Sequence, residues 1–396
     1  MLRVPLFAVL VSAPAVAGFA ASGGAVAAAW QTIKPGGGTG CAHGGEYAFF
    51  YRPGTNGKLV VEFEGGGACW DALSCEVVQS FTSSVNVEHQ LRSLESGGGV
   101  HGGAGSKSPF ADWDHLFIPY CSADAHGGNA SHNYGLVTIH HLGRRNAEAA
   151  LNWLYAKKLT PSVTATIGCS AGSLGAMIYA PDVASAYPKA RSVYWGDSYV
   201  GVFTSKCFKE GVEHWNMTFS HHVPGLSPAN VKRVVDNSSI NPGEFIVDQT
   251  MTSFPHNRFA SYTSDADVVQ TSFWVLGGGD LLDWTKQMRS FVAYVHKKFP
   301  SIYATFIASG SAHCRSQDDG FFGVEAKGVH LADWVGSIAE GTLPKDEEEV
   351  DCCAGAPIAD TADGPAAAPN VSALAETLGR LGPWQARLGS WLKGAH

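Results

Sequence analysis

The sequence is poor in charge, and this excludes one class of partner. Charged residues fill 16% of its 396 positions, and 27 lysines and arginines against 35 aspartates and glutamates give a net charge of −8. Such a chain has no basic field to attract DNA or RNA, so we expect no nucleic-acid partner. Past the N-terminal segment no apolar run reaches membrane length, so we expect no membrane span.

Metal-ligand patterns and internal repeats are also missing. The chain has nine cysteines, but no Cys-x-x-Cys pair is accompanied by the pair of histidines that a zinc site would require. We therefore expect no metal and no other cofactor. With 45% apolar residues, the chain can form one large α/β domain with a full core, which we expect to be a monomer.

The N-terminal segment has the pattern of a secretory signal. Residues 1–29 combine Arg3 with an apolar core over 6–16 and small residues suited to cleavage. A membrane anchor is the alternative, but residues 18–24 are too rich in glycine and alanine to span well. We expect a secreted protein, in which cysteines form disulfides. Four sequons fit glycosylation in that compartment: Asn129, Asn216, Asn237 and Asn370.

The rest of the chain divides into a domain, a linker and a tail. We expect the domain over residues 30–343, an acidic and then alanine- and proline-rich linker over 344–370, and an amphipathic tail over 371–396. Within the domain, strand-like and helix-like segments alternate, which predicts a mostly parallel sheet with helices on both faces.

Two local patterns add to this outline. The pair Asn56-Gly57 between apolar runs at 46–51 and 59–64 predicts a β-hairpin. Residues 80–112 are polar and glycine-rich, which predicts a surface loop over the site.

The motif Gly168-Cys169-Ser170-Ala171-Gly172 lies between a strand-like and a helix-like run. On such a turn, Gly-x-Ser-x-Gly presents the serine hydroxyl at the top of a sheet, close to the N–H groups of the next helix. A chance match is the alternative, because the chain contains 47 glycines. The flanking segments favour Ser170 as a nucleophile.

A serine hydroxyl needs a base to take its proton and an acid to orient that base. In this fold the acid and then the histidine follow later strands. His313 follows the last predicted strand, 302–308, and is the expected base. Asp265 and Asp267 both follow the strand at 258–263, and position alone does not separate them.

Acyl transfer also needs N–H donors for the oxyanion. The run Gly65-Gly66-Gly67 follows the strand at 59–63, and glycines let backbone N–H groups approach a substrate closely. A simple turn is the alternative. Together with the N–H of Ala171, directly after the serine, this run predicts an oxyanion loop.

Polar and aromatic residues near these motifs are candidates for the pocket. Asp197 follows another strand and is expected to shape the pocket wall. The other expected pocket residues are Trp70, Asp124, His126 and Tyr199. The run Tyr194-Trp195, with Tyr199 and Phe203, predicts a shallow acyl side that favours acetyl groups, unless these rings face the core instead.

The motifs together resemble the pectin acetylesterase family, which also includes the Wnt-deacylating carboxylesterase Notum. The resemblance extends over residues 38–340. Its motifs, in chain order, are Glu64-Gly65-Gly66-Gly67-Ala68-Cys69 with Cys75, Tyr120-Cys121-Ser122-x-Asp124, Gly168-Cys169-Ser170-Ala171-Gly172, Gly196-Asp197-Ser198, Asp267-x-x-Gln270 and Ser309-Gly310-Ser311-x-His313. The resemblance implies an α/β-hydrolase-like fold and a Ser-Asp-His triad that works without a metal.

The resemblance also implies roles for single residues. The family's acid lies in an Asp-x-x-Gln motif, which selects Asp267. Its oxyanion donors correspond to Gly66, Gly67 and Ala171. The cysteine positions imply a Cys69–Cys75 bridge and, more remotely, a Cys41–Cys121 bridge.

One departure from the family pattern concerns the pocket. Plant members usually carry a tryptophan just after the glycines, and Notum's loop has one too, whereas here Ala68 follows Gly67 and Trp70 comes after the cysteine. This leaves the acyl and alcohol specificity open.

The sequence thus predicts a secreted serine carboxylesterase that removes acetyl groups from an extracellular polysaccharide. One alternative is a deacylase that removes longer acyl groups from proteins or lipids. A second is a catalytically inactive, glycan-binding protein, which an intact triad argues against.

Overall fold

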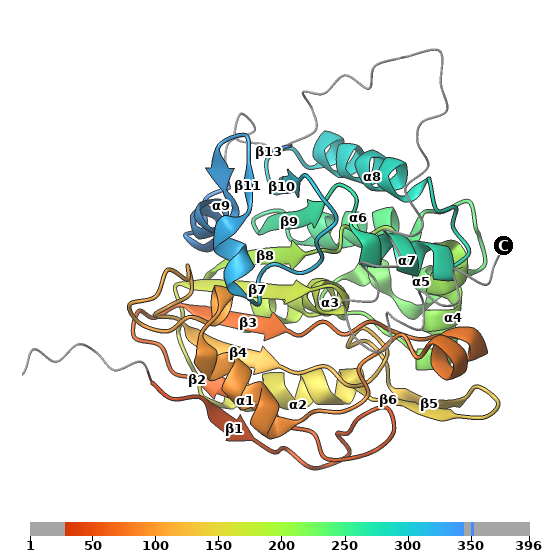
Figure 1. Cartoon of the computed structure of the whole chain (residues 1–396), viewed down its shortest axis with the longest axis horizontal. Coiled ribbons are helices and arrows are strands. Elements are labelled where there is room, and N and C mark those ends of the chain that lie inside the picture. Colours follow the sequence, from red (N-terminus) through yellow and green to blue (C-terminus); the bar gives the residue numbers. More distant parts are fainter. Residues whose placement is uncertain (1–27, 344–349, 352–396) are drawn as a thin grey trace, which may run out of the picture.

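In the computed structural model, which describes residues 28–343 and 350–351, a nine-stranded sheet runs through the centre of the molecule (Figure 1). The strand order is β1-β2-β4-β3-β7-β8-β9-β10-β13. All neighbours from β4 to β13 are parallel, while β2 runs antiparallel to both β1 and β4. The bounds are β1 (Gln31–Ile33), β2 (Phe49–Arg52), β3 (Leu59–Phe63), β4 (Asp114–Ile118), β7 (Val163–Cys169), β8 (Arg191–Asp197), β9 (Arg258–Ser264), β10 (Tyr303–Ala308) and β13 (Val350–Asp351).

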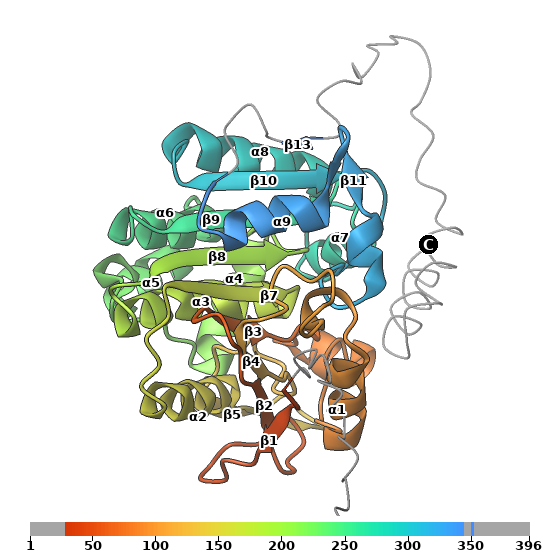
Figure 2. The ribbon, with the colours of Figure 1, turned by 90° about the vertical axis from the view of Figure 1, so that its left-hand side faces the viewer.

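Helices cover both faces of the sheet, as the sequence predicts, and Figure 2 shows α9 crossing in front of it. The helices are α1 (Val87–Ser96), α2 (Gly143–Ala156), α3 (Ala171–Ala186), α4 (Ser205–Trp215), α5 (Pro228–Val235), α6 (Pro242–Ser253), α7 (Val268–Leu276), α8 (Trp284–Lys298) and α9 (Leu331–Ala339). Two short ribbons complete the elements used below: β5 (Ala130–Asn133) with β6 (Thr138–His141), and β11 (Glu325–Ala326) with β12 (Val329–His330). In the part of the chain described, no helix is long and apolar enough to cross a membrane.

Strand β10 illustrates why both faces need cover. Successive side chains of a strand point to opposite faces of the sheet. Tyr303 and Ile307 pack into the core that α2, α3, α6 and α8 share, whereas Ala304 and Phe306 pack into the core under α9. Every residue of β10 is therefore buried, which is typical of a parallel sheet between two helical layers.

The predicted hairpin is wrong. β4 lies between β2 and β3, so β2 pairs antiparallel with β4, and β3 pairs in parallel with both β4 and β7. β3 is buried along its whole length and needs a hydrogen-bonded neighbour on each edge. Gly57 does turn the chain with a φ of 65°, but the turn joins strands that are two places apart.

The loop predicted over residues 80–112 contains a helix, α1. The side chain of Asn86 caps it by accepting a hydrogen bond from the N–H of His89 at 3.0 Å. The helix packs Leu94 against β2 and β4, beside Trp30, Phe50 and Phe117.

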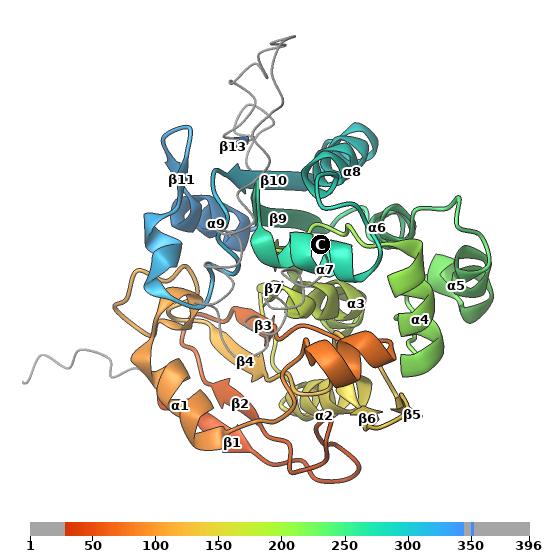
Figure 3. The same ribbon diagram turned by 45° about the vertical axis from the view of Figure 1, so that its right-hand side comes forward.

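The parallel strands all end at one edge of the sheet, and the loops that follow them meet there. Figure 3 shows α7 and α4 in front of this edge, around the start of α3. The residues predicted to carry chemistry follow β3, β7, β8, β9 and β10. The predicted tail, nearly all of the predicted linker and residues 1–27 of the predicted signal lie outside the described residues.

Candidate active site

Ser170 lies at the sharp turn between β7 and α3. Its φ of 56° and ψ of −124° are backbone angles that few L-residues adopt. The turn is tight enough that a Cβ on Gly168 would lie 2.2 Å from the carbonyl oxygen of Gly172. A Cβ on Gly172 would lie 2.0 Å from the carbonyl oxygen of Phe63 in β3, so both positions of the motif require glycine.

The backbone of Asp197 holds this turn from the neighbouring strand. Its carbonyl oxygen accepts hydrogen bonds from the N–H of Ser170 at 2.8 Å and from Oγ of Ser173 at 2.7 Å. The hydroxyl of Ser173 also donates to the carbonyl oxygen of Gly168 at 2.8 Å. The unusual backbone of Ser170 is thus fixed from within the sheet, and its side chain faces the cavity described below.

His313 is hydrogen-bonded to Asp267, the acid that the family resemblance selects. Nδ1 of His313 lies 2.8 Å from Oδ2 and 3.0 Å from Oδ1 of Asp267. Asp267 is fully buried and also caps α7, where its Oδ1 accepts from the N–H groups of Val269 and Gln270. Its Oδ2 accepts a further hydrogen bond at 3.0 Å from Nε2 of Gln270.

Asp265, two residues earlier, binds the backbone of the histidine loop instead of the imidazole. Its Oδ1 accepts a hydrogen bond at 2.9 Å from the N–H of Gly310, at the start of the loop that carries His313. The structure therefore places Asp267 against the imidazole and Asp265 against the loop backbone, a distinction that position in the sequence alone could not make.

The surroundings of His313 favour its charged form. Burial alone lowers its pKa, but the charge of Asp267, the hydrogen bond to it and the charge of Asp197 outweigh burial and raise the pKa above the ordinary 6.5. A base in this environment binds a proton from Ser170 more readily than an isolated imidazole does.

The glycine run after β3 lies beside Ser170. A Cβ on Gly65 would lie 2.5 Å from the carbonyl oxygen of Cys169, and one on Gly67 would lie 2.0 Å from that of Ser80. The carbonyl of Gly66 and the N–H of Ala68 pair with residues 80–82, whereas no described residue accepts a hydrogen bond from the N–H of Gly66 or of Gly67. Ala171 is the first residue of α3, where N–H groups lack an intrahelical partner. These three donors can serve an oxyanion.

An apolar cavity of about 120 Å³ opens beside Ser170 and His313. Trp70, Tyr199 and Phe203 line it, as expected, and Phe273 adds a further aromatic wall. The other two rings expected at the acyl side face away. Tyr194 donates from its hydroxyl to the carbonyl of Ser173, and Trp195 packs on the opposite face of the sheet against Phe321.

Asp124 and His126, which were expected at the pocket, lie beneath the oxyanion loop instead. His126 Nε2 donates to the carbonyl oxygen of Glu64 at 2.8 Å, and burial lowers its pKa to about 4, so the ring is neutral. Asp124 is fully buried and accepts from Oγ of Ser122, the N–H of His126 and the N–H of Gly143. Both residues support the loop from below.

Asp197 was also expected at the pocket wall, and it too is fully buried. Its Oδ2 accepts hydrogen bonds from the N–H groups of Arg315 at 2.8 Å and Ser316 at 2.7 Å. Its Oδ1 accepts from Oγ of Ser198 at 2.7 Å, so both oxygens of this buried carboxyl are hydrogen-bonded within the protein and organise the histidine loop.

Sequence reasoning missed Glu64 as a supporting residue. Its half-buried carboxyl accepts hydrogen bonds from the N–H of Tyr120 at 2.9 Å and from Nε2 of Gln90. Burial raises the pKa of Glu64 to about 7. The position directly before Gly65 was the available signal, because a residue there must anchor the loop.

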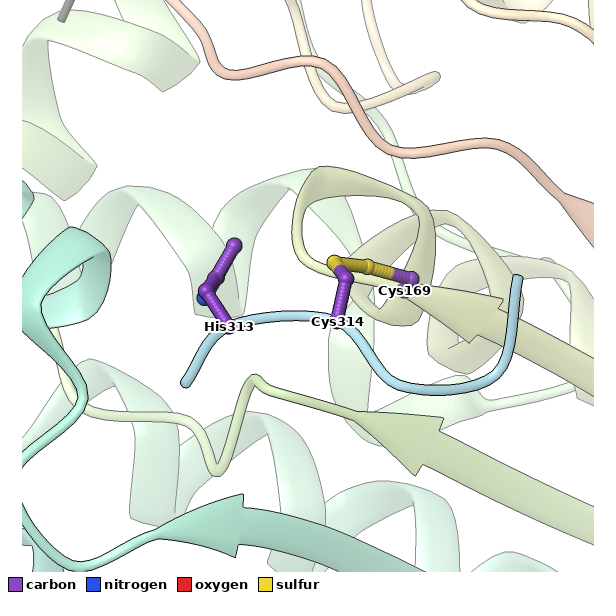
Figure 4. A group of neighbouring side chains, drawn as sticks. All are labelled: Cys169, His313 and Cys314. Carbon is purple, nitrogen blue, oxygen red and sulfur yellow. A yellow bond between two sulfur atoms is a disulfide. The ribbon is translucent and has the colours of Figure 1, made fainter. Parts of the chain in front are cut away.

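Three disulfides join cysteines of the described residues. Cys69–Cys75 and Cys41–Cys121, which the resemblance implied, are both present. A third, Cys169–Cys314, was not expected and joins the residue before Ser170 to the residue after His313 (Figure 4). Cys207 is a free thiol.

A sequence model of the pectinacetylesterase family matches residues 31–273. The chain belongs to the pectinacetylesterase family. The match includes Ser170 and Asp267 and ends before His313, so the place of His313 rests on the geometry above.

Two curated relatives from Arabidopsis thaliana are similar over part of the chain. Pectin acetylesterase 11 is 28% identical and pectin acetylesterase 7 is 27% identical, each over 159 residues, or 39% of this chain. The matched stretch spans 40% of the length of each relative. Among solved structures, the Wnt deacylase Notum from Drosophila superposes with a TM-score of 0.58 at 14% identity, covering 81% of this chain and 95% of that one. This likeness supports the α/β-hydrolase-like fold.

We predict that Asp267→Asn lowers kcat on the order of 10⁴-fold, because an amide no longer holds the imidazole in the required tautomer. Asp265→Asn is the matched control and should cost far less. Steady-state kinetics on p-nitrophenyl acetate compare the two. The opposite ranking would make Asp265 the acid.

A pH profile of the same variant provides a second prediction. The reaction needs neutral His313, so wild-type kcat/KM should fall as the pH drops through a pKa above 6.5. Asp267→Asn removes the charge that raises this pKa, so the residual activity should persist to lower pH. An unchanged acid limb would contradict the Asp267–His313 coupling.

The Cys69–Cys75 bridge should matter more for activity than for folding. Closing so short a loop contributes about 2 kcal/mol to the free energy of unfolding. The same bridge fixes the segment after Gly66 and Gly67, so Cys75→Ser should lose kcat at temperatures where circular dichroism still reports a folded protein. Parallel loss of activity and fold on heating would show that the bridge only stabilises.

Proposed function

We propose that this protein is a serine carboxylesterase whose leading reaction is the removal of O-acetyl groups from an extracellular polysaccharide. The observation that carries the proposal is the pairing of His313 with buried Asp267 at the cavity that Ser170 also lines. A serine on a strained turn, an imidazole held by a carboxylate and unused N–H donors form the arrangement that acyl transfer requires.

In this mechanism Oγ of Ser170 attacks the ester carbonyl while Nε2 of His313 takes its proton. The oxyanion of the tetrahedral intermediate accepts hydrogen bonds from the N–H groups of Gly66, Gly67 and Ala171. His313 then returns the proton to the departing alcohol, which leaves an acyl group on Ser170. Water, deprotonated by His313, attacks this acyl-enzyme and releases the acid.

The acetylated polysaccharide is proposed as substrate from the family and the relatives of the chain. Both curated relatives are named pectin acetylesterases, and the chain shares their family. Secretion is proposed on three disulfides, which persist in oxidising compartments. The sequons at Asn216 and Asn237 lie at exposed positions, where a glycan could be attached.

A second candidate, a deacylase of larger acyl groups, is favoured by the cavity. Its volume of about 120 Å³ exceeds the need of an acetyl methyl and approaches the ~150 Å³ apolar cavity that binds benzene in another protein. Leu174, Phe208 and Met217 extend the apolar lining beyond the aromatic walls. The pairing of His313 with Asp267, at a cavity that Ser170 also lines, argues against a glycan-binding protein without activity.

Ser170→Ala should abolish ester hydrolysis and leave the fold unchanged, since loss of a triad nucleophile costs several orders of magnitude in rate. Ser93→Ala, on the exposed surface of α1, is the matched control and should keep full activity. Turnover of p-nitrophenyl acetate by purified protein measures both. Near-wild-type turnover in Ser170→Ala would end the nucleophile assignment.

Acyl length separates the two candidate functions. We expect kcat/KM for p-nitrophenyl esters from C2 to C16 to peak between C2 and C4, and acetylated pectin to release acetate. A cavity that accepts longer chains would instead gain about 0.8 kcal/mol for each methylene buried. A peak at C8 or beyond, with no acetate from acetylated glycans, would replace the acetylesterase by the second candidate.

A further inference from the structure

We propose that the Cys169–Cys314 disulfide is a positioning element that holds His313 in register with Ser170. This inference rests on the proposed function, because it assigns a role within the same triad. The bridge joins residues 145 apart in the sequence, with their Cα atoms 5.7 Å apart.

The position of the two cysteines is the first observation. Cys169 directly precedes Ser170, and Cys314 directly follows His313, so the bridge links the two reacting residues through one peptide unit on each side (Figure 4). A ring nitrogen of His313 lies within 4.8 Å of both sulfur atoms. A bridge placed elsewhere on these loops would leave several rotatable residues between itself and the reacting atoms.

The second observation is that the histidine loop has little regular structure of its own. Residues 309–318, all of them described, form neither helix nor strand between β10 and the short 3₁₀ turn Asp319–Gly323. Cys314 has a φ of 55°, in the left-handed region that non-glycine residues rarely adopt. Such a bend persists where its surroundings fix it.

Asp267 cannot provide this constraint by itself. Its carboxylate fixes Nδ1 of His313, but the placement of the opposite nitrogen relative to Ser170 also depends on where the loop backbone lies. The loop has a second set of anchors near Cys314. Ser198 Oγ accepts from the N–H of Cys314 at 2.8 Å, and Asp197 accepts from the two residues that follow.

These anchors set the expected size of the effect. Because Asp197 and Ser198 remain when the bridge is cut, the loop should stay near its place but lose its exact distance to Ser170. A displacement of about 1 Å in a catalytic group costs on the order of 10²-fold in rate. We therefore expect a partial loss of kcat, well short of the loss in Ser170→Ala.

The test compares Cys169→Ala, Cys314→Ala and the double variant. We expect kcat on p-nitrophenyl acetate to fall about 10- to 100-fold with KM nearly unchanged. The two single variants and the double variant should lose the same factor, because each breaks the same bond. If the loss of kcat in the double variant equalled the product of the two single losses, the two side chains would act separately and the proposal would be overturned.

The matched control is Cys41→Ala/Cys121→Ala, which removes a buried bridge of separation 80. It should lower Tm and leave kcat unchanged below the transition. If both bridges lowered kcat only in proportion to their loss of Tm, Cys169–Cys314 would be a structural bridge and the proposal would fail.

A fluorophosphonate probe separates this inference from the proposed function. The probe modifies an activated serine whatever the natural ester is, so the labelling rate of Ser170 reports on His313 directly. The bridge variants should label about 10- to 100-fold more slowly than wild type. Wild-type labelling without turnover of any ester would refute the proposed function and leave the inference standing. Equal labelling of wild type and variants would overturn the inference.

Discussion

The candidate site depends on one close approach, between the first turn of α3 and the end of β3. Gly172 comes so near the carbonyl of Phe63 that no side chain fits between them. This contact favours the sharp turn of the chain at Ser170. The carbonyl oxygen of Asp197 stabilises the turn by accepting a hydrogen bond from the N–H of Ser170 at 2.8 Å. Because β3 also leads directly into the glycine run, one packing contact sets the distance between the serine and the N–H groups that we propose as oxyanion donors.

Sequence reasoning found the elements whose signals are local. The alternation of strands and helices, the turn at Ser170 and the position of His313 after the strand that became β10 all follow from patterns within a few residues. Strand pairing does not follow from such local patterns, which is why the predicted hairpin is wrong. β4 is separated from β3 by residues 64–113, and it enters between β2 and β3 because β3 must be paired on both edges.

The pocket was the least predictable part for the same reason. Whether a ring faces the cavity or the core depends on the strand face on which it falls. Trp195 lies one residue from Tyr194 and therefore points to the opposite side of the sheet. Asp124, His126 and Asp197 were selected as polar residues in loops after strands, and all three proved to be buried supports. Polar residues near a site serve its scaffold as readily as its substrate.

The site divides into groups that face the cavity and acidic groups that support its loops. This division explains how a few charged residues can hold all the loops of the site in place. Ser170 and His313 line the cavity, whereas Asp267, Asp197 and Asp124 are fully buried and Glu64 is half-buried, and none of these four lines it. Each of these carboxyl groups accepts a backbone N–H from a loop, as for Tyr120 and Arg315, or from the first turn of a helix, as for Gly143 and Val269. A buried acceptor without hydrogen bonds destabilises the folded protein. Each carboxyl group therefore favours the arrangement of its neighbours in which its hydrogen bonds are made. The loops that present Ser170, His313 and the oxyanion donors thus obtain their rigidity from the same few acidic residues.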